Sequence, residues 1–244
     1  SYRFKGKPLA NILGIPMIGH CYIRSKMCQK LTDLYVATCD KEIFDYINSI
    51  DGKAIMTSDK HDRASDRAAE CLLKVEKDLN QRFDIVVMIQ GDEPMLTPSM
   101  ISESFTPLIN DKNLKVTNLM AEIDDLSEFE DPNEVKVVVN KRNEALYFSR
   151  EAIPSLKKFD KEATKLKQVC IISFRRDYLL EFNDMPQAPL EIIESVDMMR
   201  VIENDDIVKM VLTNTNTWSV DTKEDLEKVE QKMKNDILIK EYQN

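Results

Sequence analysis

The sequence predicts an α/β fold with three layers, built on a mostly parallel sheet and carrying an inserted region of mixed strands. Two patterns indicate this class. In the first half of the chain, short apolar runs alternate with helix-like segments, as in right-handed βαβ crossovers. In the second half, strand-like runs follow one another with little helix between them, which favours mixed or antiparallel pairing. A chain of 244 residues is long enough to bury one core of this kind.

The first half is predicted to contain strands and helices in strict alternation. Strands are expected at 33–39, 53–57 and 83–89, and helices at 16–30, 41–50 and 64–79. In parallel sheets, ligands bind beyond the carboxyl ends of the strands. The polar residues that follow the strand at 83–89 are therefore the first candidates for a functional site.

The second half is predicted to contain more strands than helices. Strands are expected at 114–121, 135–139, 145–148, 169–174 and 208–212, and helices at 190–202 and 223–240. No internal repeat or low-complexity linker divides the chain. We therefore expect a single domain over 1–244, with an insertion at about 114–176.

Composition and charge argue against several classes of protein. The formal net charge is −9 and no stretch is basic, so binding to nucleic acid phosphates is not expected. No apolar run approaches the roughly 20 residues that span a bilayer, and no secretory signal is visible, so no membrane association is expected. The cysteines are odd in number and form no CxxC pair, which is typical of reduced thiols in a cytoplasmic protein; they are Cys21, Cys28, Cys39, Cys71 and Cys170.

The segment VVMIQGDEP at 86–94 is the most informative motif. A buried strand is predicted to end at Gln90, and Gly91 allows the backbone to turn tightly. Asp92 and Glu93 then emerge at the carboxyl end of the strand, where a carboxylate can hold Mg²⁺. Mg²⁺ takes one or two protein carboxylates and fills its other positions with water and phosphate oxygens. A solvated acidic turn has the same pattern, so spacing alone leaves both interpretations open.

A second acidic candidate, Asp221, lies in WSVDTKED at 218–225. It is suited to cap a helix, and Glu224 three residues later resembles the partner in a capping box. Taken alone, this pattern favours a capping role. Only a partner carboxylate such as Asp92 makes a role as a metal ligand the better interpretation.

Basic residues gather near the start of the sequence, in SYRFKGKPL. Gly6 frees the backbone between Arg3, Lys5 and Lys7, so this loop could grip phosphates, with Lys7 neutralising the β and γ phosphates of a nucleotide. The spacing is not that of a P-loop. A solvated basic turn is equally consistent with the pattern.

The segment HDRASDR at 61–67 lies between a predicted strand and a predicted helix. Ser65 is suited to cap that helix, whose free amide groups could meet an anion or the edge of a base. His20 and His61 show neither triad partners nor zinc-site spacing, which favours structural roles for both.

Taken in order, these segments resemble the 3-deoxy-manno-octulosonate cytidylyltransferase (CMP-Kdo synthetase) family, which activates the inner acid sugar of Gram-negative lipopolysaccharide. The blocks that carry the resemblance span nearly the whole chain and include FKGKPLANILGIPMIGH, SDRAAE, VMIQGDEPML, DPNEVKVVV, ALYFSREAIP and SVDTKEDLEKV. It implies a fold like that of the nucleotide-diphospho-sugar transferases and a homodimer formed by the insertion. The family also has a strand before the lysine loop, and we expect that first strand to be missing from the sequence given.

The resemblance implies an enzyme that transfers CMP from CTP to an acid sugar and releases pyrophosphate. Asp92 and Asp221 would be the paired ligands of Mg²⁺, and Lys7 would bind the triphosphate with Arg3. The implied nucleotide-binding residues are Arg3, Lys7, Ser65, Arg67 and Gln90. The implied acid-binding residues are Gln90, Arg150, Gln168, Ile172, Asp197 and Met198, with the Arg150 guanidinium suited to a carboxylate.

The sequence departs from the family at four acid-side positions. Gln168 and Ile172 stand where the family has a His and a Tyr, and Asp197 and Met198 stand where it has a Glu–Gln pair. We therefore expect CTP chemistry with an altered second substrate, such as another 2-keto sugar acid, an amino-substituted relative of the octulosonate or a small phosphonate. A catalytically silent nucleotide-binding homologue and a nucleotidyltransferase for another base are the alternatives.

Overall fold

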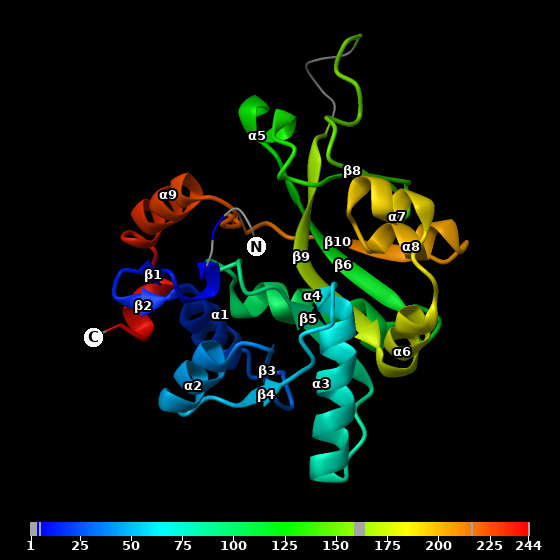
Figure 1. The fold of residues 1–244 in the computed structure, drawn as a ribbon. Coiled ribbons are helices and arrows are strands. Elements are labelled where there is room, and N and C mark those ends of the chain that lie inside the picture. The colour runs from blue at the N-terminus through cyan, green and yellow to red at the C-terminus, as the bar shows by residue number, and fades with distance from the viewer. Residues whose placement is uncertain (1–3, 5, 159–163, 216, 244) are drawn as a thin grey trace. The chain divides into compact units, whose positions relative to one another are not determined.

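The computed structural model describes residues 4, 6–158, 164–215 and 217–243 (Figure 1). The chain forms two compact units. The first unit comprises Ser1–Arg82, Ile89–Ser102 and Thr217–Asn244, and the second comprises Phe83–Met88 and Glu103–Asn216. Three expectations about domain organisation remain predictions: a single domain over 1–244, an insertion at about 114–176 and a missing first strand.

The first unit begins with short elements that lead into a helix. A 3-10 helix, η1 (Lys7–Leu9), is followed by the hairpin of β1 (Asn11–Ile12) and β2 (Ile15–Pro16) and then by α1 (Met17–Lys26). Gly6 takes φ 74° where the chain enters η1, a left-handed conformation that glycine adopts without steric cost. The turn brings Lys7 into a buried position.

A βαβ unit follows in the first unit, as the sequence predicts. β3 (Val36–Thr38) and β4 (Ala54–Met56) pair in parallel and are connected by α2 (Lys41–Ser49). Asp40 caps α2, because its side chain accepts the N–H of Glu42 at 2.8 Å. α3 (Ala64–Leu79) has the predicted bounds and ends where Asn80 takes a left-handed φ of 49°.

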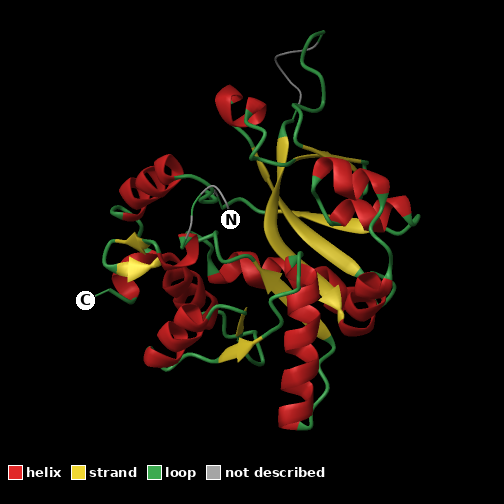
Figure 2. Ribbon diagram, in the orientation of Figure 1, coloured by secondary structure: helices red, strands yellow, loops and turns green. Residues whose placement is uncertain are grey.

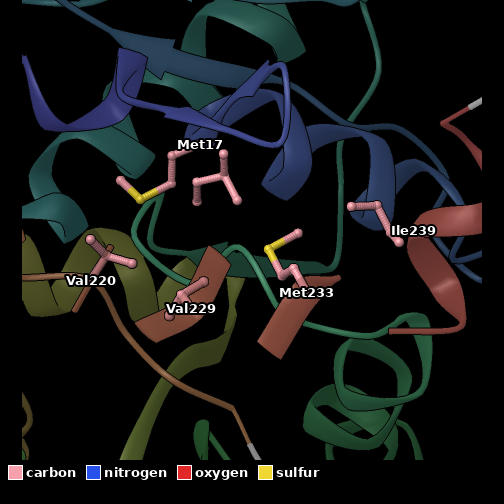
Figure 3. Packing of buried hydrophobic residues seen from close by; sticks show 6 residues of the cluster. Met17, Val220, Val229, Met233 and Ile239 are labelled. Carbon is pink, nitrogen blue, oxygen red and sulfur yellow. The ribbon is translucent and has the colours of Figure 1, made fainter. Parts of the chain in front are cut away.

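A hydrophobic cluster joins the C-terminal helix α9 (Lys223–Met233) to the first elements of the chain (Figure 3). Its buried members are Ile12, Met17, Val220, Val229, Met233 and Ile239. Val229 and Met233 are four residues apart on α9 and therefore share one helix face. Val220 directly precedes Asp221, so this packing also fixes the backbone that carries the second candidate carboxylate.

The second unit is built on a mixed sheet with the strand order β10-β6-β9-β7-β8, and β5 pairs with β9 (Figure 2). The strands are β5 (Ile85–Ile89), β6 (Val116–Glu122), β7 (Lys136–Val139), β8 (Ala145–Ser149), β9 (Leu166–Arg175) and β10 (Val208–Leu212). β10 and β6 are parallel, whereas β9 is antiparallel to both β6 and β7. Every strand predicted in this half of the chain is present, within a few residues of its expected bounds.

The strands from β6 to β9 have little helix between them, as the sequence predicts, because the helix described there is the five-residue α5 (Leu126–Glu130). Further helices lie on either side of this stretch: α4 (Pro98–Asn110) before it, and α6 (Arg176–Asp184), α7 (Pro189–Glu194) and α8 (Met198–Glu203) after it. α4 continues through Pro107, which lacks an N–H and so argues against a helix when the sequence is considered alone. The helix expected at 190–202 is divided into α7 and α8, because Ser195 takes a left-handed φ of 54°.

Two further helices are shorter than expected. The helix predicted at 16–30 ends at Lys26, and the one predicted at 223–240 ends at Met233, with a separate 3-10 turn, η2 (Leu238–Glu241), after it. No helix in the described residues is long and apolar enough to cross a membrane.

Candidate functional site

Three of the predicted site residues meet in the first unit. Lys7 Nζ lies 2.9 Å from Asp92 Oδ2 and 3.2 Å from Asp221 Oδ1. Lys7 belongs to η1, Asp92 follows β5, and Asp221 precedes α9, so the three come from distant parts of the sequence. The side chain of Lys7 is 11% exposed, and those of Asp92 and Asp221 are 22% and 33% exposed.

The charges of this cluster determine the protonation of Lys7. Burial by itself would lower the pKa of the ammonium, but the charges and hydrogen bonds of Asp92 and Asp221 outweigh burial, and the pKa is raised. Lys7 is therefore a cation at neutral pH. It offsets the repulsion between two carboxylates that are close to each other.

The loop that carries Asp92 is held tightly by its neighbours. A side chain at Gly91 would bring a Cβ to 2.8 Å from Ile18 Cδ1, so the end of the Ile18 side chain would have to shift to admit it. The N–H of Val220 donates to the carbonyl of Asp92 at 3.0 Å and so connects this loop to the segment that carries Asp221. The backbones of the two acidic residues are thereby fixed against each other.

Glu93 is a buried structural residue, which the sequence pattern did not indicate. It is 3% exposed, and its Oε2 accepts a hydrogen bond from Thr217 Oγ1 at 2.8 Å. Thr217 is itself 2% exposed. This contact is a second connection between the Asp92 loop and the Asp221 segment, and it shows that the turn is more than a solvated acidic loop.

Replacing Thr217 by valine is expected to destabilise the protein by about 1–3 kcal/mol, because the buried Glu93 carboxylate loses a hydroxyl donor. Urea unfolding measures the change. Thr217→Ser keeps the hydroxyl and is the matched control, expected to remain closer to the wild type. Equal stabilities for the valine and serine variants would show that the hydrogen bond contributes nothing.

The structure corrects the alternative in which Asp221 caps the last helix. The N-cap of α9 is Thr222, whose Oγ1 accepts the N–H of Asp225 at 3.1 Å. Asp225 Oδ2 in turn accepts the N–H of Thr222 at 2.9 Å, which completes a capping box without Glu224. Asp221 lies one residue before the cap, and its carboxylate faces Lys7 instead.

The paired carboxylates suit a divalent cation. Among the described residues, no group of three or more His, Cys, Asp or Glu side chains could hold a metal ion. Two carboxylates alone are nevertheless the usual protein contribution to a Mg²⁺ site, whose remaining ligands are water and substrate phosphates. Asp92 and Asp221 are therefore chemically suited to a magnesium–nucleotide complex.

The segment from Thr57 to Arg67 in the first unit is held by side-chain hydrogen bonds. The guanidinium of Arg67 donates to Thr57 Oγ1 at 2.6 Å and to the Ser58 carbonyl at 3.2 Å. His61 Nε2 contacts Glu70 Oε2, which agrees with the structural role expected for this histidine. Ser65 does not cap α3, because the helix starts at Ala64 with Arg63 as N-cap, and Ser65 is fully buried inside the first turn.

Glu70 organises this segment and makes it sensitive to acid. Hydrogen bonds from the Lys74 ammonium and the Ser58 N–H, followed by one from His61, hold the pKa of Glu70 at about 2, below the ordinary value of 4.5. A carboxyl group whose pKa is depressed in the folded protein stabilises the fold above the unfolded pKa, and this contribution is lost as pH falls towards the folded pKa.

The stability difference between wild type and Glu70→Gln is therefore expected to be largest above about pH 4.5 and to shrink as the pH falls towards 2. Urea unfolding at a series of pH values measures it. A difference that stays constant across this range would contradict the assignment. Glu42→Gln, an exposed change in α2 for which no such contacts exist among the described residues, is the control.

The remaining predicted residues lie elsewhere in the structure. Gln90 directly follows β5, in the first unit, and Arg3 lies outside the described residues. In the second unit, Gln168 on β9 donates to Asn118 Oδ1 at 2.6 Å. Ile172 and Met198 are 1% and 0% exposed and belong to the core of that unit. Asp197 directly precedes α8.

Arg150, also in the second unit, uses its guanidinium to hold loops together. Nε donates to the carbonyl of Glu194 at 2.8 Å and Nη1 to the carbonyl of Pro132 at 2.9 Å, with a longer contact from Nη2 to Ser195 O at 3.5 Å. A guanidinium has five N–H donors. These contacts use one N–H of Nη1 and one of Nη2, so a second N–H on each terminal nitrogen can still donate to an anion.

A buried polar network, which sequence reasoning missed, contacts the chain just after Asp92, at the carbonyl of Leu96. Arg24 in α1 donates from Nε to Tyr242 Oη at 2.9 Å and from Nη1 to the Leu96 carbonyl at 3.4 Å, and it pairs with Asp236. His20 is fully buried between Tyr242 Oη and the carbonyl of Ile12, both at 2.8 Å. Because a carbonyl only accepts, His20 Nε2 is the protonated nitrogen.

Comparison with known proteins gives the family of the chain. A family model described as cytidylyltransferase matches residues 1–211. A curated relative, the 3-deoxy-manno-octulosonate cytidylyltransferase of Geobacter metallireducens (strain ATCC 53774 / DSM 7210 / GS-15), is 36% identical over 243 residues. The alignment covers 96% of this chain and 93% of the relative.

Solved structures agree with this result. The structure of CMP:2-keto-3-deoxy-manno-octonic acid synthetase complexed with CTP matches with a TM-score of 0.86 and 36% identity, over 96% of this chain and 94% of that one. A putative glucose-1-phosphate thymidylyltransferase from Bacillus anthracis shares the fold at 14% identity, with a TM-score of 0.64 over 94% of this chain and 87% of that one. These matches confirm the predicted α/β fold class. The chain therefore belongs to the cytidylyltransferase family, as its motifs predict, and is a nucleotidyltransferase.

Proposed function

We propose that the protein transfers CMP from CTP to 3-deoxy-manno-octulosonate or a closely related 2-keto sugar acid and releases pyrophosphate. The observation that carries this proposal is the convergence of Lys7, Asp92 and Asp221. The two carboxylates can bind a magnesium ion, and the ammonium beside them can bind the triphosphate that accompanies the ion. The names of the similar proteins support the choice of nucleotide and acid.

The reaction needs positioning and charge neutralisation more than a protein nucleophile. The anomeric hydroxyl oxygen of the acid forms a bond to the α-phosphorus of CTP and loses its proton to solvent. The bond from that phosphorus to the bridging oxygen breaks, and pyrophosphate leaves with the electron pair. Lys7 would bind the leaving phosphates, whose negative charge it is suited to neutralise.

Asp92 and Asp221 would hold Mg²⁺ in this reaction. When bound, the ion neutralises the phosphate oxygens and orients the attacking and leaving groups. The hydrogen bonds from Val220 and Thr217 to the Asp92 loop hold the backbones of Asp92 and Asp221 close together before any substrate binds. The other proposed nucleotide contacts rest on the resemblance alone; they are Arg3, Ser65, Arg67 and Gln90.

The identity of the acid depends on residues of the second unit. Arg150 would bind the carboxylate of the acid through the guanidinium N–H groups that do not contact the neighbouring loops. Gln168, Ile172, Asp197 and Met198 would shape the rest of the pocket. Ile172 and Met198 are 1% and 0% exposed, so their proposed part in the pocket rests on the resemblance. An amino-substituted octulosonate or a small phosphonate is the second candidate, because the sequence departs from the family at all four of these positions.

A pyrophosphate-release assay with CTP and Mg²⁺ tests the proposal. The panel contains 3-deoxy-manno-octulosonate, its amino-substituted relative, other 2-keto sugar acids and small phosphonates, and CTP is compared with ATP, GTP and UTP. Release with the octulosonate supports the first candidate, and release only with another acid supports an altered pocket. Thermal stabilisation by CTP without release from any acid would favour a catalytically silent homologue and overturn the proposal.

We further propose that the protein acts in the cytoplasm as a homodimer. The described cysteines are all free of disulfides, which agrees with a reducing compartment. Leu126 and Leu146, both within 114–176, are 54% and 55% exposed, and large exposed apolar side chains often mark an interface. Sedimentation at micromolar concentration is expected to give the mass of two chains, and a monomer would contradict the proposal.

A further inference from the structure

Lys7 contacts the same two carboxylates that we propose as ligands of Mg²⁺. Its Nζ lies within hydrogen-bonding distance of Asp92 Oδ2 and Asp221 Oδ1, at 2.9 and 3.2 Å. Within the described part of the chain, these carboxylates are the acceptors for Nζ. Two cations cannot lie between the same pair of oxygens, so the ammonium and a divalent ion exclude each other there.

We propose that Lys7 is a positioning residue that competes with Mg²⁺ for Asp92 and Asp221, and that the triphosphate of CTP relieves the competition by giving the ammonium a new partner. This inference rests on the proposed function. Lys7 thereby has two successive partners, first the carboxylates and then the phosphates. Metal binding and nucleotide binding are coupled through one side chain.

The backbone of Lys7 permits such an exchange, because only the side chain has to move. Lys7 begins η1, its carbonyl accepts the N–H of Ala10 at 3.0 Å, and its own N–H donates to Phe4 O at 3.3 Å. Pro8 fixes φ at the next position. The main chain is therefore anchored, while the four-carbon side chain ends in a freely rotating ammonium.

Charge explains why the nucleotide has to take part. A divalent ion balances both carboxylates, whereas one ammonium balances only one of them. If the metal arrives alone, it displaces an ammonium whose side chain is 11% exposed, and a weakly hydrated, unpaired charge is unfavourable. If CTP arrives with the metal, its phosphates pair with the displaced ammonium.

This exchange makes a thermodynamic prediction about the two ligands. Coupling between binding sites is reciprocal, so CTP strengthens metal binding by the factor by which the metal strengthens CTP binding. If the ammonium is removed, the metal no longer has to displace it. A neutral residue at position 7 is therefore expected to bind the metal more tightly in the absence of nucleotide.

The experiment measures Mn²⁺ binding to the full chain without nucleotide, from the electron paramagnetic resonance signal of free Mn²⁺. Lys7→Met, which keeps the length of the side chain without its charge, is expected to bind Mn²⁺ about tenfold more tightly than the wild type, within the usual range of coupling. Lys7→Gln is a second neutral variant with the same expectation, should the methionine variant not fold. Lys7→Arg keeps the charge and is expected to bind no more tightly than the wild type.

Two controls distinguish competition at the carboxylates from a general change in the net charge of the protein. Lys232 is also in the first unit, where its ammonium lies over the Trp218 ring at 3.8 Å, and Lys232→Met removes the same charge away from the carboxylates. Its Mn²⁺ affinity is expected to equal that of the wild type. Adding Asp92→Asn to Lys7→Met is expected to abolish the gain.

Equal or weaker Mn²⁺ binding by both neutral variants would overturn the inference, as would an equal gain in Lys232→Met. The measurement involves no turnover and is therefore independent of the assay for the proposed function. If the wild type releases pyrophosphate but the neutral variants bind Mn²⁺ no more tightly, the function stands and the competition fails. If no acid gives release, the function fails whatever the affinity of Lys7→Met.

Discussion

Asp92→Asn and Asp221→Asn are each expected to reduce turnover at least about 10²–10³-fold, in the range that follows loss of one electrostatic contact to a transition state. Asparagine keeps the shape of the side chain but removes the charge that a divalent ion and Lys7 share. Pyrophosphate release with CTP and the best acid of the panel measures the loss. It should appear in kcat at saturating CTP, since the proposed role concerns charge in the transition state.

Folding should be little affected by these changes. Each replacement leaves Lys7 in contact with the other carboxylate, so its buried ammonium keeps a charged partner. Asp45→Asn, which alters an exposed pair with Lys41 on α2, is the control and should keep the wild-type rate. A variant at Asp92 or Asp221 with wild-type turnover would remove that residue from the proposed metal site.

Arg200→Met is expected to cost about 3–5 kcal/mol of unfolding free energy, because it leaves the buried Glu191 carboxylate without its guanidinium. Arg200 Nε and Nη2 each lie 2.7 Å from an oxygen of Glu191, and the two residues are 3% and 0% exposed. Arg200 also donates to the Phe182 carbonyl at 2.8 Å. Urea unfolding of the full chain measures the loss.

A double replacement tests whether the cost comes from the unpaired charge. Arg200→Met combined with Glu191→Met removes both charges and is expected to recover part of the stability. Arg142→Met, at an exposed arginine paired with Glu144, is the matched control and should change stability by less than about 0.5 kcal/mol. A single variant as stable as the control would show that the buried pair is not needed.

The parts of the fold that follow local rules could be predicted from the sequence. α3 has a continuous helical pattern from Ala64 to Leu79 and ends at Asn80, a residue that tolerates the left-handed conformation. α4 was missed because Pro107 is a strong local signal against helix, and only packing in the folded chain overrides it. The break at Ser195 was missed for the opposite reason, since no glycine or proline marks it.

Prediction of the site was limited by contacts between distant segments. Sequence alone proposed Lys7, Asp92 and Asp221, but only the fold shows that one ammonium contacts both carboxylates. Thr222 rather than Asp221 caps α9, a choice that depends on one residue of register and that a local pattern cannot settle. The contact between Glu93 and Thr217 joins residues more than a hundred positions apart, and no spacing rule reports it.

The network around Arg24 has a practical consequence for handling the protein. Tyr242 lies near the C-terminal end of the described residues, yet its hydroxyl contacts both His20 and Arg24, and Arg24 also contacts the carbonyl of Leu96. Leu96 lies four residues after Asp92. Proteolytic trimming that removes Tyr242 would therefore disturb α1 and, through Arg24, the loop that carries a candidate metal ligand. Loss of activity during storage is thus worth checking first by intact mass at the C-terminus.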